Sequence, residues 1–493
     1  MLEGSFLPYV DGVSHRGPLF YASVALAVRV FGNGTWLPVR ALSLLAIAAT
    51  LAFGFWAAWG ARRSVAGAVM MLVSAGALCV AMPLDDGLGY NSEQPLSALA
   101  MASLTCLVFA LGSRAASRRV AWAALSGVAL SASGLCKQTG FALLLPFGLW
   151  IACAAIAAPE LSPRERRAIP SAFALGVTLP VLALVVRYAA AGELSTLFYY
   201  FVTYNTRVYL AAFAGSEGLR EPADALRSHF YVFLALAPLV LALVLTPFSG
   251  VTRLRELPRA YADNGFDTTV GLAALITPFV ANASLRDLDH YYVQVVPFAG
   301  FALGIAVERV LGESTPSRRA LIARCAALLP LIAVVELGWR HRAQSFRQDP
   351  GVQERFVTHD SAICRFLEKN TDPTDTLFVW GFFPAPYTAC NRRPASRYVY
   401  TTFVSGYVPH VHDSPANDAA RAAPGSHAIL EAELAKARPG AIIDVPLTLG
   451  LRSLWADDFL RKLVESDYCE LPDLKALGMR AWVRRGHPAC PAR

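Results

Sequence analysis

The sequence predicts a polytopic α-helical membrane protein that carries a small α/β domain after its helices. Ten apolar stretches approach or reach the roughly 20 residues needed to cross a bilayer. Hydrophobic residues make up 55% of the chain and charged residues 16%, which is typical of helices whose backbone polar groups pair internally in lipid. The stretches are residues 38–60, 65–82, 95–112, 120–136, 139–157, 169–189, 228–248, 269–283, 290–308 and 320–338.

Arginine clusters occupy every second connector between these stretches, and they predict which side each connector faces, because positive charge near helix ends resists translocation. The connectors expected to be cytoplasmic hold Arg62 and Arg63; Arg114, Arg118 and Arg119; Arg164, Arg166 and Arg167; Arg253, Arg255 and Arg259; and Arg309, Arg318 and Arg319. These turns account for much of the formal net charge of +8. No basic stripe interleaved with aromatic residues indicates nucleic-acid binding.

The remaining connectors should face outward, and they are residues 83–94, the turn at Lys137, residues 190–227, residues 284–289 and everything after about residue 339. Residues 1–37 also have the character of an outward loop and lack the basic segment and apolar run of a signal peptide. Since a chain does not readily begin outside, we expect one more transmembrane helix upstream of Met1. The alternative is translocation of the amino terminus without such a helix.

The chain divides into a predicted membrane unit, residues 1–339, and a predicted extracytoplasmic α/β domain, residues 340–493. Within the latter, β-rich runs alternate with stretches of helical spacing. The runs are residues 376–380, 398–402 and 441–445, and the helical stretches are residues 361–369, 428–437 and 453–465.

Four cysteines of this domain form an even set in a region expected to lie in an oxidising compartment. They are Cys364, Cys390, Cys469 and Cys490. One or two disulfides are therefore expected, with four free thiols as the alternative. Their spacing is unlike that of a paired C-x-x-C zinc site.

Motifs in the outward loops point to a function. The amino-terminal loop contains Pro8-Tyr9-Val10-Asp11 and then His15-Arg16-Gly17-Pro18-Leu19-Phe20-Tyr21. These residues resemble the first extracytoplasmic loop of the GT-C superfamily of polyprenyl-phosphate-sugar glycosyltransferases, which include bacterial protein mannosyltransferases and aminoarabinose transferases. In that superfamily a PY-x-D segment precedes a K/R-G/P-P-L-x-Y segment.

Later motifs continue the resemblance along nearly the whole chain. The N-x-E element ending at Glu93, the turn Lys137-Gln138 and the segment from His290-Tyr291 to Pro297 are similar to family elements, as is Arg286 just before the last of these. The tail adds a W-G-x-x-P element at Trp380 and an R-x-P-A-S-R-Y run that ends at Tyr398. One departure matters: the aspartate that family members usually carry after their first transmembrane helix would lie upstream of Met1.

The resemblance implies candidate site residues at the outward face. Lys137 and Arg286 are candidate partners of the donor phosphate, and His290 and Tyr291 are further substrate-binding candidates. Asp11 and Glu93 match motif positions and are the candidate catalytic carboxylates, ahead of Asp85 and Asp86. A carboxylate of this kind would accept the proton of the acceptor or hold a divalent cation, and cations would stabilise the departing phosphate.

Each candidate has a structural alternative: a solvated loop acid, a lysine or arginine anchored at the interface, or a tyrosine of the aromatic belt. An exposed lysine at a helix end would contribute little to stability. For Arg393 and Arg397 in the tail, packing of the small domain is the favoured interpretation over binding of a charged acceptor.

The resemblance thus implies a glycosyltransferase of a bacterial cytoplasmic (inner) membrane. It would move a sugar from a polyprenyl-phosphate donor to an extracytoplasmic lipid, glycan or protein, among membrane lipids and with inversion at the anomeric carbon. A divalent cation is a possible cofactor. One alternative is a transporter or flippase of a lipid-linked or anionic solute, although the paired broken helices that would favour it are absent from the sequence. The other is a catalytically inactive membrane subunit.

Overall fold

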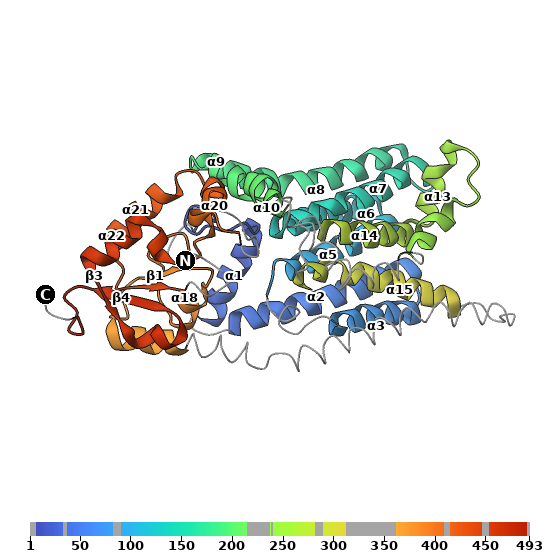
Figure 1. Cartoon of the computed structure of the whole chain (residues 1–493). Coiled ribbons are helices and arrows are strands. Elements are labelled where there is room, and N and C mark those ends of the chain that lie inside the picture. The colour runs from blue at the N-terminus through green and yellow to red at the C-terminus, as the bar shows by residue number, and fades with distance from the viewer. Residues whose placement is uncertain are drawn as a thin grey trace.

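The computed structural model describes residues 6–32, 37–81, 90–213, 237, 240–281, 289–311, 361–408, 415–445 and 453–490. A bundle of long helices forms one part of the molecule, and an α/β unit built from the C-terminal residues covers one end of that bundle (Figure 1). The predicted boundary between residues 339 and 340 lies outside the described residues, so it stays a prediction.

The bundle helices coincide with the predicted apolar stretches wherever the chain is described. They are α2 (Leu37–Arg62), α3 (Val65–Ala81), α5 (Glu93–Gly112), α6 (Ala116–Cys136), α7 (Leu144–Ala157), α8 (Pro163–Ala190), α14 (Gly265–Ala281) and α15 (Val296–Leu311). Within the described residues, five helical segments are long and apolar enough to cross a membrane: Leu37–Arg62, Glu93–Gly112, Ala116–Cys136, Gln138–Ala157 and Pro163–Ala190. The stretch at residues 320–338 and most of residues 228–248 lie outside the described residues, so the number of spans remains a prediction.

Small residues let neighbouring helices of the bundle approach backbone to backbone. A side chain at Gly127 of α6 would place its Cβ 2.2 Å from the carbonyl oxygen of Phe173, and one at Gly176 of α8 would lie 2.1 Å from the carbonyl oxygen of Ala124. Such contacts are typical of helices that associate in membranes, where burial of apolar surface does not drive association. Helix α5 is largely buried and packs against both α2 and α6.

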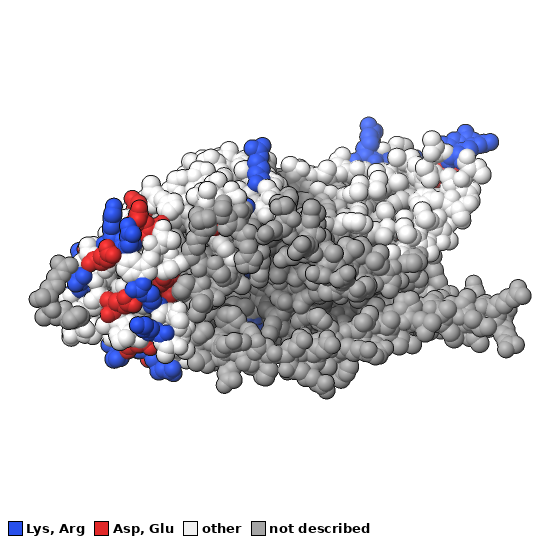
Figure 2. Space-filling model, viewed as in Figure 1, with Lys and Arg blue, Asp and Glu red and all other residues white. Residues whose placement is uncertain are grey.

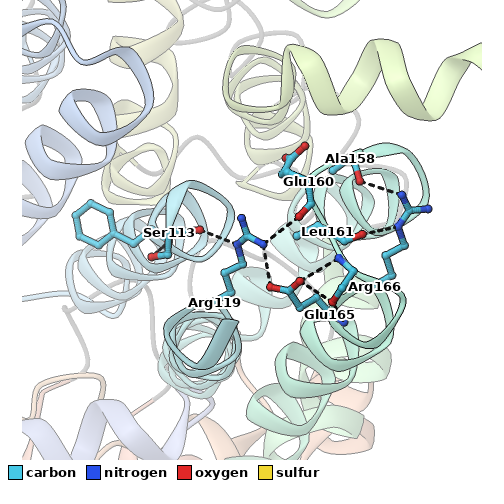
Figure 3. Close-up of polar contacts among 9 residues, drawn as sticks. Ser113, Arg119, Ala158, Glu160, Leu161, Glu165 and Arg166 are labelled. Carbon is cyan, nitrogen blue, oxygen red and sulfur yellow. Dashed lines mark hydrogen bonds and ion pairs between the residues drawn. The ribbon is translucent and has the colours of Figure 1, made fainter. Parts of the chain in front are cut away.

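The arginine-bearing helix ends gather at the end of the bundle away from the α/β unit, near α13 (Leu257–Asp263) (Figure 1). There the Arg62 guanidinium donates to both carboxylate oxygens of Asp267, at 2.7 and 2.8 Å. In a second network Arg119 donates to the Glu165 carboxylate at 2.8 Å and to the carbonyl oxygen of Ser113 at 2.6 Å (Figure 3). The predicted cytoplasmic connectors that the structure describes therefore share one end of the bundle.

Charged residues are distributed as a membrane-embedded bundle would require. In Figure 2 lysine, arginine, aspartate and glutamate are interspersed over the α/β unit, whereas the described surface of the bundle that faces the viewer is almost uncharged until its far end. Many large apolar side chains on the bundle are exposed, including Leu44, Leu175 and Phe279. Lipid is the solvent that suits such a surface.

The predicted connector 190–227 is not simply a loop. Its described part folds into α9 (Leu194–Phe198), a π-helix η2 (Tyr199–Tyr209) and α10 (Leu210–Phe213). Hydropathy did not reveal this helix because its eleven residues mix tyrosines with Asn205 and Arg207. Helix α1 (Pro18–Phe31) follows the amino-terminal loop and lies between the bundle and the α/β unit (Figure 1).

The α/β unit contains a four-stranded mixed sheet in the order β1-β2-β4-β3. Strand β1 (Leu377–Trp380) is parallel to β2 (Ala441–Asp444), which is antiparallel to β4 (Arg480–Arg484), and β4 pairs with β3 (Tyr468–Leu471). Residues 361–370 are helical, and further helices are α18 (Ala385–Ala389), α19 (Thr402–Ser405), α20 (Pro415–Arg421), α21 (Ser426–Ala437), α22 (Asp458–Asp467) and the 3-10 helices η7 (Leu454–Ala456) and η8 (Pro472–Leu477).

Two of the predicted β-rich runs are strands and one is not. Residues 376–380 and 441–445 contain β1 and β2, but residues 398–402 form turns that lead into α19. The prediction of a β-rich run at 398–402 is wrong because this segment leaves the sheet and docks on the amino-terminal loop, where the Val13 amide donates to the carbonyl oxygen of Arg397 at 3.0 Å.

Two disulfides join the four cysteines of the unit, Cys364 to Cys390 and Cys469 to Cys490. The expectation of disulfides is confirmed, and the alternative of four free thiols is wrong. Bonds of this kind persist in oxidising compartments.

Candidate active site

The candidate site begins where two bundle helices change direction at the end nearest the α/β unit. Glu93 is the first residue of α5, and Lys137 is the extended residue between α6 and the 3-10 helix η1 (Gln138–Leu143). The chain turns back closely here, since the Gly140 amide donates to the carbonyl oxygen of Lys137 at 2.9 Å. A Cβ at Gly140 would lie 2.7 Å from Ser133 Oγ, so the turn requires glycine.

Lys137 and Glu93 form an ion pair at this point. The ammonium group contacts the Glu93 carboxylate, which is 1% exposed, and it lies 3.8 Å from the centroid of the Tyr291 ring. Ser92 Oγ donates to the other carboxylate oxygen at 3.1 Å. The lysine is therefore not the exposed helix-end residue that the sequence indicated: it neutralises a buried acid and packs against an aromatic ring.

The amino-terminal loop brings a second cation to the same place. Arg16 donates to Asn91 Oδ1 at 3.2 Å, and its guanidinium lies 5.1 Å from the Phe20 ring centroid. The loop is fixed to α6 by the Gly17 amide, which donates to the carbonyl oxygen of Cys136 at 3.0 Å. A Cβ at Gly17 would lie 2.0 Å from a backbone oxygen, so this approach also depends on glycine.

Helix η2 and the 3-10 helix η6 (Asp289–Gln294) supply the remaining wall. The hydroxyls of Tyr209 and Tyr291 are 2.9 Å apart, and the His15 ring stacks on Tyr209 with ring centroids 5.1 Å apart. Asn205 Nδ2 donates to the carbonyl oxygen of His15 at 3.1 Å. These contacts join η2, η6 and the amino-terminal loop into one rim.

Together these elements enclose a cavity of about 420 Å³. Arg16, Lys137 and His290 line it, and among the described lining residues Glu93 is the one carboxylate. Much of the remaining wall is apolar or aromatic, and it consists of Phe141, Phe201, Val202, Leu210, Val280 and Ala281. The cavity thus offers both cationic groups and apolar surface to a bound molecule.

Four of the six predicted site residues meet in this cavity: Glu93, Lys137, His290 and Tyr291. Asp11 does not join them. It is exposed and accepts a hydrogen bond from the Leu7 amide at 2.6 Å, which stabilises a turn of the loop. Arg286 lies outside the described residues, as do Asp85 and Asp86.

The structure also places Arg397, for which the sequence left two roles open, and several site residues that the sequence did not predict. Arg397 donates to the Glu433 carboxylate at 2.6 Å, which favours the packing role expected for it. Arg16, His15 and the residues of η2 were not predicted as site residues. For Arg16 a signal was available, because it occupies the basic position of the family motif.

The side chains that the structure describes in this site do not by themselves fit a divalent cation. In the described part of the chain no three His, Cys, Asp or Glu side chains are grouped to hold a metal ion. Within the cavity the Glu93 carboxylate is already neutralised by Lys137. Hard divalent cations require several oxygen ligands, so we assign no step to a metal.

The bundle and the α/β unit together have the fold of a solved structure from the superfamily that the sequence resembles. ArnT from Cupriavidus metallidurans bound to undecaprenyl phosphate is similar to this chain with a TM-score of 0.51 and 14% identity, over 97% of this chain and 89% of ArnT.

Two further solved structures are similar to this chain with lower TM-scores. Apo ArnT from the same organism has a TM-score of 0.46 and 16% identity over 77% of this chain and 75% of ArnT. The Archaeoglobus fulgidus oligosaccharyltransferase AglB, in complex with an inhibitory peptide and a dolichol-phosphate, has a TM-score of 0.41 and 12% identity over 88% of this chain and 62% of AglB. No protein-family model matches the chain, and no curated protein sequence matches it significantly.

Proposed function

We propose that this chain is a membrane glycosyltransferase that moves a sugar from a polyprenyl-phosphate donor to an acceptor outside the cytoplasm. The observation that carries the proposal is that Arg16, Lys137 and His290 line one cavity together with many apolar and aromatic side chains. A phosphate attached to an isoprenoid chain has matching anionic and apolar parts. The undecaprenyl phosphate in the ArnT complex supports this choice of donor.

The cations would bind the phosphate and stabilise the charge that it gains. In the transfer step the acceptor oxygen bonds to the anomeric carbon while the bond from that carbon to the phosphate oxygen breaks. The bonding electron pair stays on the phosphate, and the acceptor proton passes to a base. Attack opposite the leaving group inverts the anomeric carbon. Fixed cations in a site that excludes water stabilise such developing charge strongly.

Glu93 and Lys137 have linked roles in this proposal. In the described site the Glu93 carboxylate is occupied by the Lys137 ammonium group. When a donor phosphate enters, Lys137 transfers its contact to the phosphate oxygens, which frees the carboxylate to accept the acceptor proton. Donor binding would therefore activate the base.

The proposed orientation places the cavity and the α/β unit outside the cytoplasm, with the arginine-bearing helix ends inside. It is supported by the positive-inside rule and by the two disulfides of the α/β unit. A bacterial inner membrane is the proposed location, with membrane lipids around the bundle and a lipid, glycan or protein as the acceptor.

A reconstitution experiment tests this function. The full-length protein is placed in liposomes with a polyprenyl-phosphate sugar whose sugar is radiolabelled, and envelope fractions from cells that lack the protein provide acceptors. We expect the label to become covalently attached to an acceptor, and a Lys137→Met variant to lose this activity. Movement of intact donor between leaflets without covalent transfer would indicate a flippase instead. Neither transfer nor movement would indicate a catalytically inactive subunit.

A further inference from the structure

The α/β unit reaches the candidate site through one short segment, residues 397–404. The Val13 amide donates to the carbonyl oxygen of Arg397 at 3.0 Å, and the Tyr400 hydroxyl donates to Ser14 Oγ. These contacts join residues almost 400 positions apart, and they fall within three residues of Arg16.

Ser14 transmits this contact to the backbone of Arg16. Its side chain is buried, with 2% exposure, and its Oγ also accepts a hydrogen bond from the Arg16 amide at 3.4 Å. On the other side the Tyr9 hydroxyl donates to the carbonyl oxygen of Arg16 at 2.6 Å. The peptide groups on both sides of the Arg16 Cα are thus fixed by side-chain hydrogen bonds.

Aromatic packing holds Tyr400 in place. Its ring centroid lies 5.1 Å from that of Phe382 and 5.9 Å from that of Phe403. Phe403 in turn packs on Tyr200 and Tyr204 of η2, with centroids 5.4 and 4.6 Å away. The tyrosine is therefore held by the α/β unit on one side and, through Phe403, by the cavity wall on the other.

The protonation state of the Tyr400 hydroxyl allows it to act as a hydrogen-bond donor. Burial raises the pKa of Tyr400, and the nearby Arg16 guanidinium opposes that rise only in part. The hydroxyl consequently keeps its proton at neutral pH and can donate it to Ser14.

We propose that Tyr400 is a positioning residue that fixes Arg16, through Ser14, for the phosphate of the donor. The proposal rests on the proposed function, and it gives the α/β unit a part in the donor site itself. Arginine side chains are long and rich in rotamers, so an arginine binds phosphate well only where its backbone and its neighbours restrict it.

The decisive variant is Tyr400→Phe, which removes the hydroxyl and keeps the ring. The full-length protein in nanodiscs is titrated with undecaprenyl phosphate as the probe. We expect binding to weaken by about five- to tenfold, the usual effect of one hydrogen bond. Ser14→Ala should weaken binding at least as much, because it also removes the bond from the Arg16 amide. The double variant should bind no worse than Ser14→Ala, which already lacks the contact with Tyr400.

Tyr468→Phe is the matched control. Its hydroxyl is also buried in the α/β unit and donates to a backbone oxygen, that of Pro439, at 2.9 Å, but it lies on β3 rather than on the segment that touches the loop. We expect this variant to bind undecaprenyl phosphate as the wild type does. In the transfer assay Tyr400→Phe should raise the donor KM, whereas loss of folded protein would lower the apparent kcat and leave the KM unchanged.

Three results would overturn the proposal in different ways. If the wild type binds undecaprenyl phosphate and Tyr400→Phe binds it equally well, Tyr400 does not position the site although the proposed function stands. If the wild type does not bind the lipid phosphate at all, the proposed function fails, and the positioning role for a donor site fails with it. Additive losses in the double variant would show that Tyr400 and Ser14 act separately, which also contradicts the proposal.

Discussion

The ion pair between Lys137 and Glu93 leads to a prediction in which protein stability and transfer rate change independently. Removing the lysine alone, as Lys137→Met, leaves a carboxylate of 1% exposure without its counter-ion. Removing both charges, as Lys137→Met with Glu93→Gln, leaves a neutral pair of similar volume. The two variants lack the same cation in the cavity and differ in what remains buried beside it.

The magnitudes follow from burial and from the proposed chemistry. Breaking a buried ion pair by removing one partner typically costs about 3 to 5 kcal/mol, whereas neutralising both partners is often close to neutral. Loss of one fixed cation from a transition state costs about 3 to 4 kcal/mol, or on the order of a hundredfold or more in rate. We therefore expect the single variant to be both unstable and slow, and the double variant to be stable and still slow.

The assay measures both quantities on the full-length protein. Thermal unfolding in detergent reports stability, and initial rates of donor-dependent transfer are compared at equal amounts of membrane-inserted protein. Glu93→Gln alone completes the set: it keeps the lysine, and a rate lowered by about 10² to 10⁴ would fit a role as proton acceptor.

A wild-type transfer rate in the double variant would refute the phosphate-binding role of Lys137. Unchanged stability in Lys137→Met would refute the buried ion pair. A wild-type rate in Glu93→Gln would leave the lysine in its role and show that the base lies elsewhere.

Three further predictions concern the orientation and the α/β unit. A cysteine at Ala191 should react with an impermeant thiol reagent on intact cells and one at Ala115 should not, and the reverse pattern would invert the proposed topology. Cys364→Ser should lower the free energy of unfolding by about 3 to 4 kcal/mol, since the bond closes a 26-residue loop. An unchanged midpoint in chemical denaturation of the full chain would contradict this. Burial raises the pKa of Asp444 from its usual 3.8 to about 6, so its folded form binds the proton more tightly. The protonated carboxyl group therefore stabilises the folded protein fully below about pH 4. This contribution to the free energy of unfolding, about 3 kcal/mol, is lost as the pH rises to about 6. Unfolding measured from pH 4 to 7.5 should show this fall in the wild type but not in Asp444→Asn, and equal profiles would refute it.

Much of the fold was predictable because lipid imposes simple requirements on a chain. Apolar stretches such as residues 38–60 and 95–112 must be helical, since no water satisfies their backbone, and arginines such as Arg62 and Arg119 mark a common side. By contrast, η2 could not be predicted from hydropathy. Its tyrosines are polar enough to resemble a loop, and two of them, Tyr200 and Tyr204, pack against Phe403 of the distant α/β unit.

The candidate site was predictable as a set of residues but not as a set of contacts. Glu93 and Lys137 each matched a motif, yet 44 positions separate them and nothing in either motif indicates an ion pair. Asp11 matched a motif as well, but its carboxylate is used by the turn that contains it. The contribution of Tyr400 could not be predicted from the sequence, because it depends on where a segment of the distant α/β unit docks.

The π-helix η2 makes the cavity unusually sensitive to the length of the chain. A π-helix holds one more residue in each hydrogen-bonded turn than an α-helix does, so deleting a single residue within Tyr199–Tyr209 would allow an ordinary α-helix to form. Every following side chain would then rotate by about 100° around the helix axis. Tyr209 would lose both His15 and Tyr291, while the bundle itself would remain intact. Changes in length, rather than substitutions, are thus the simplest way to give this wall a new shape.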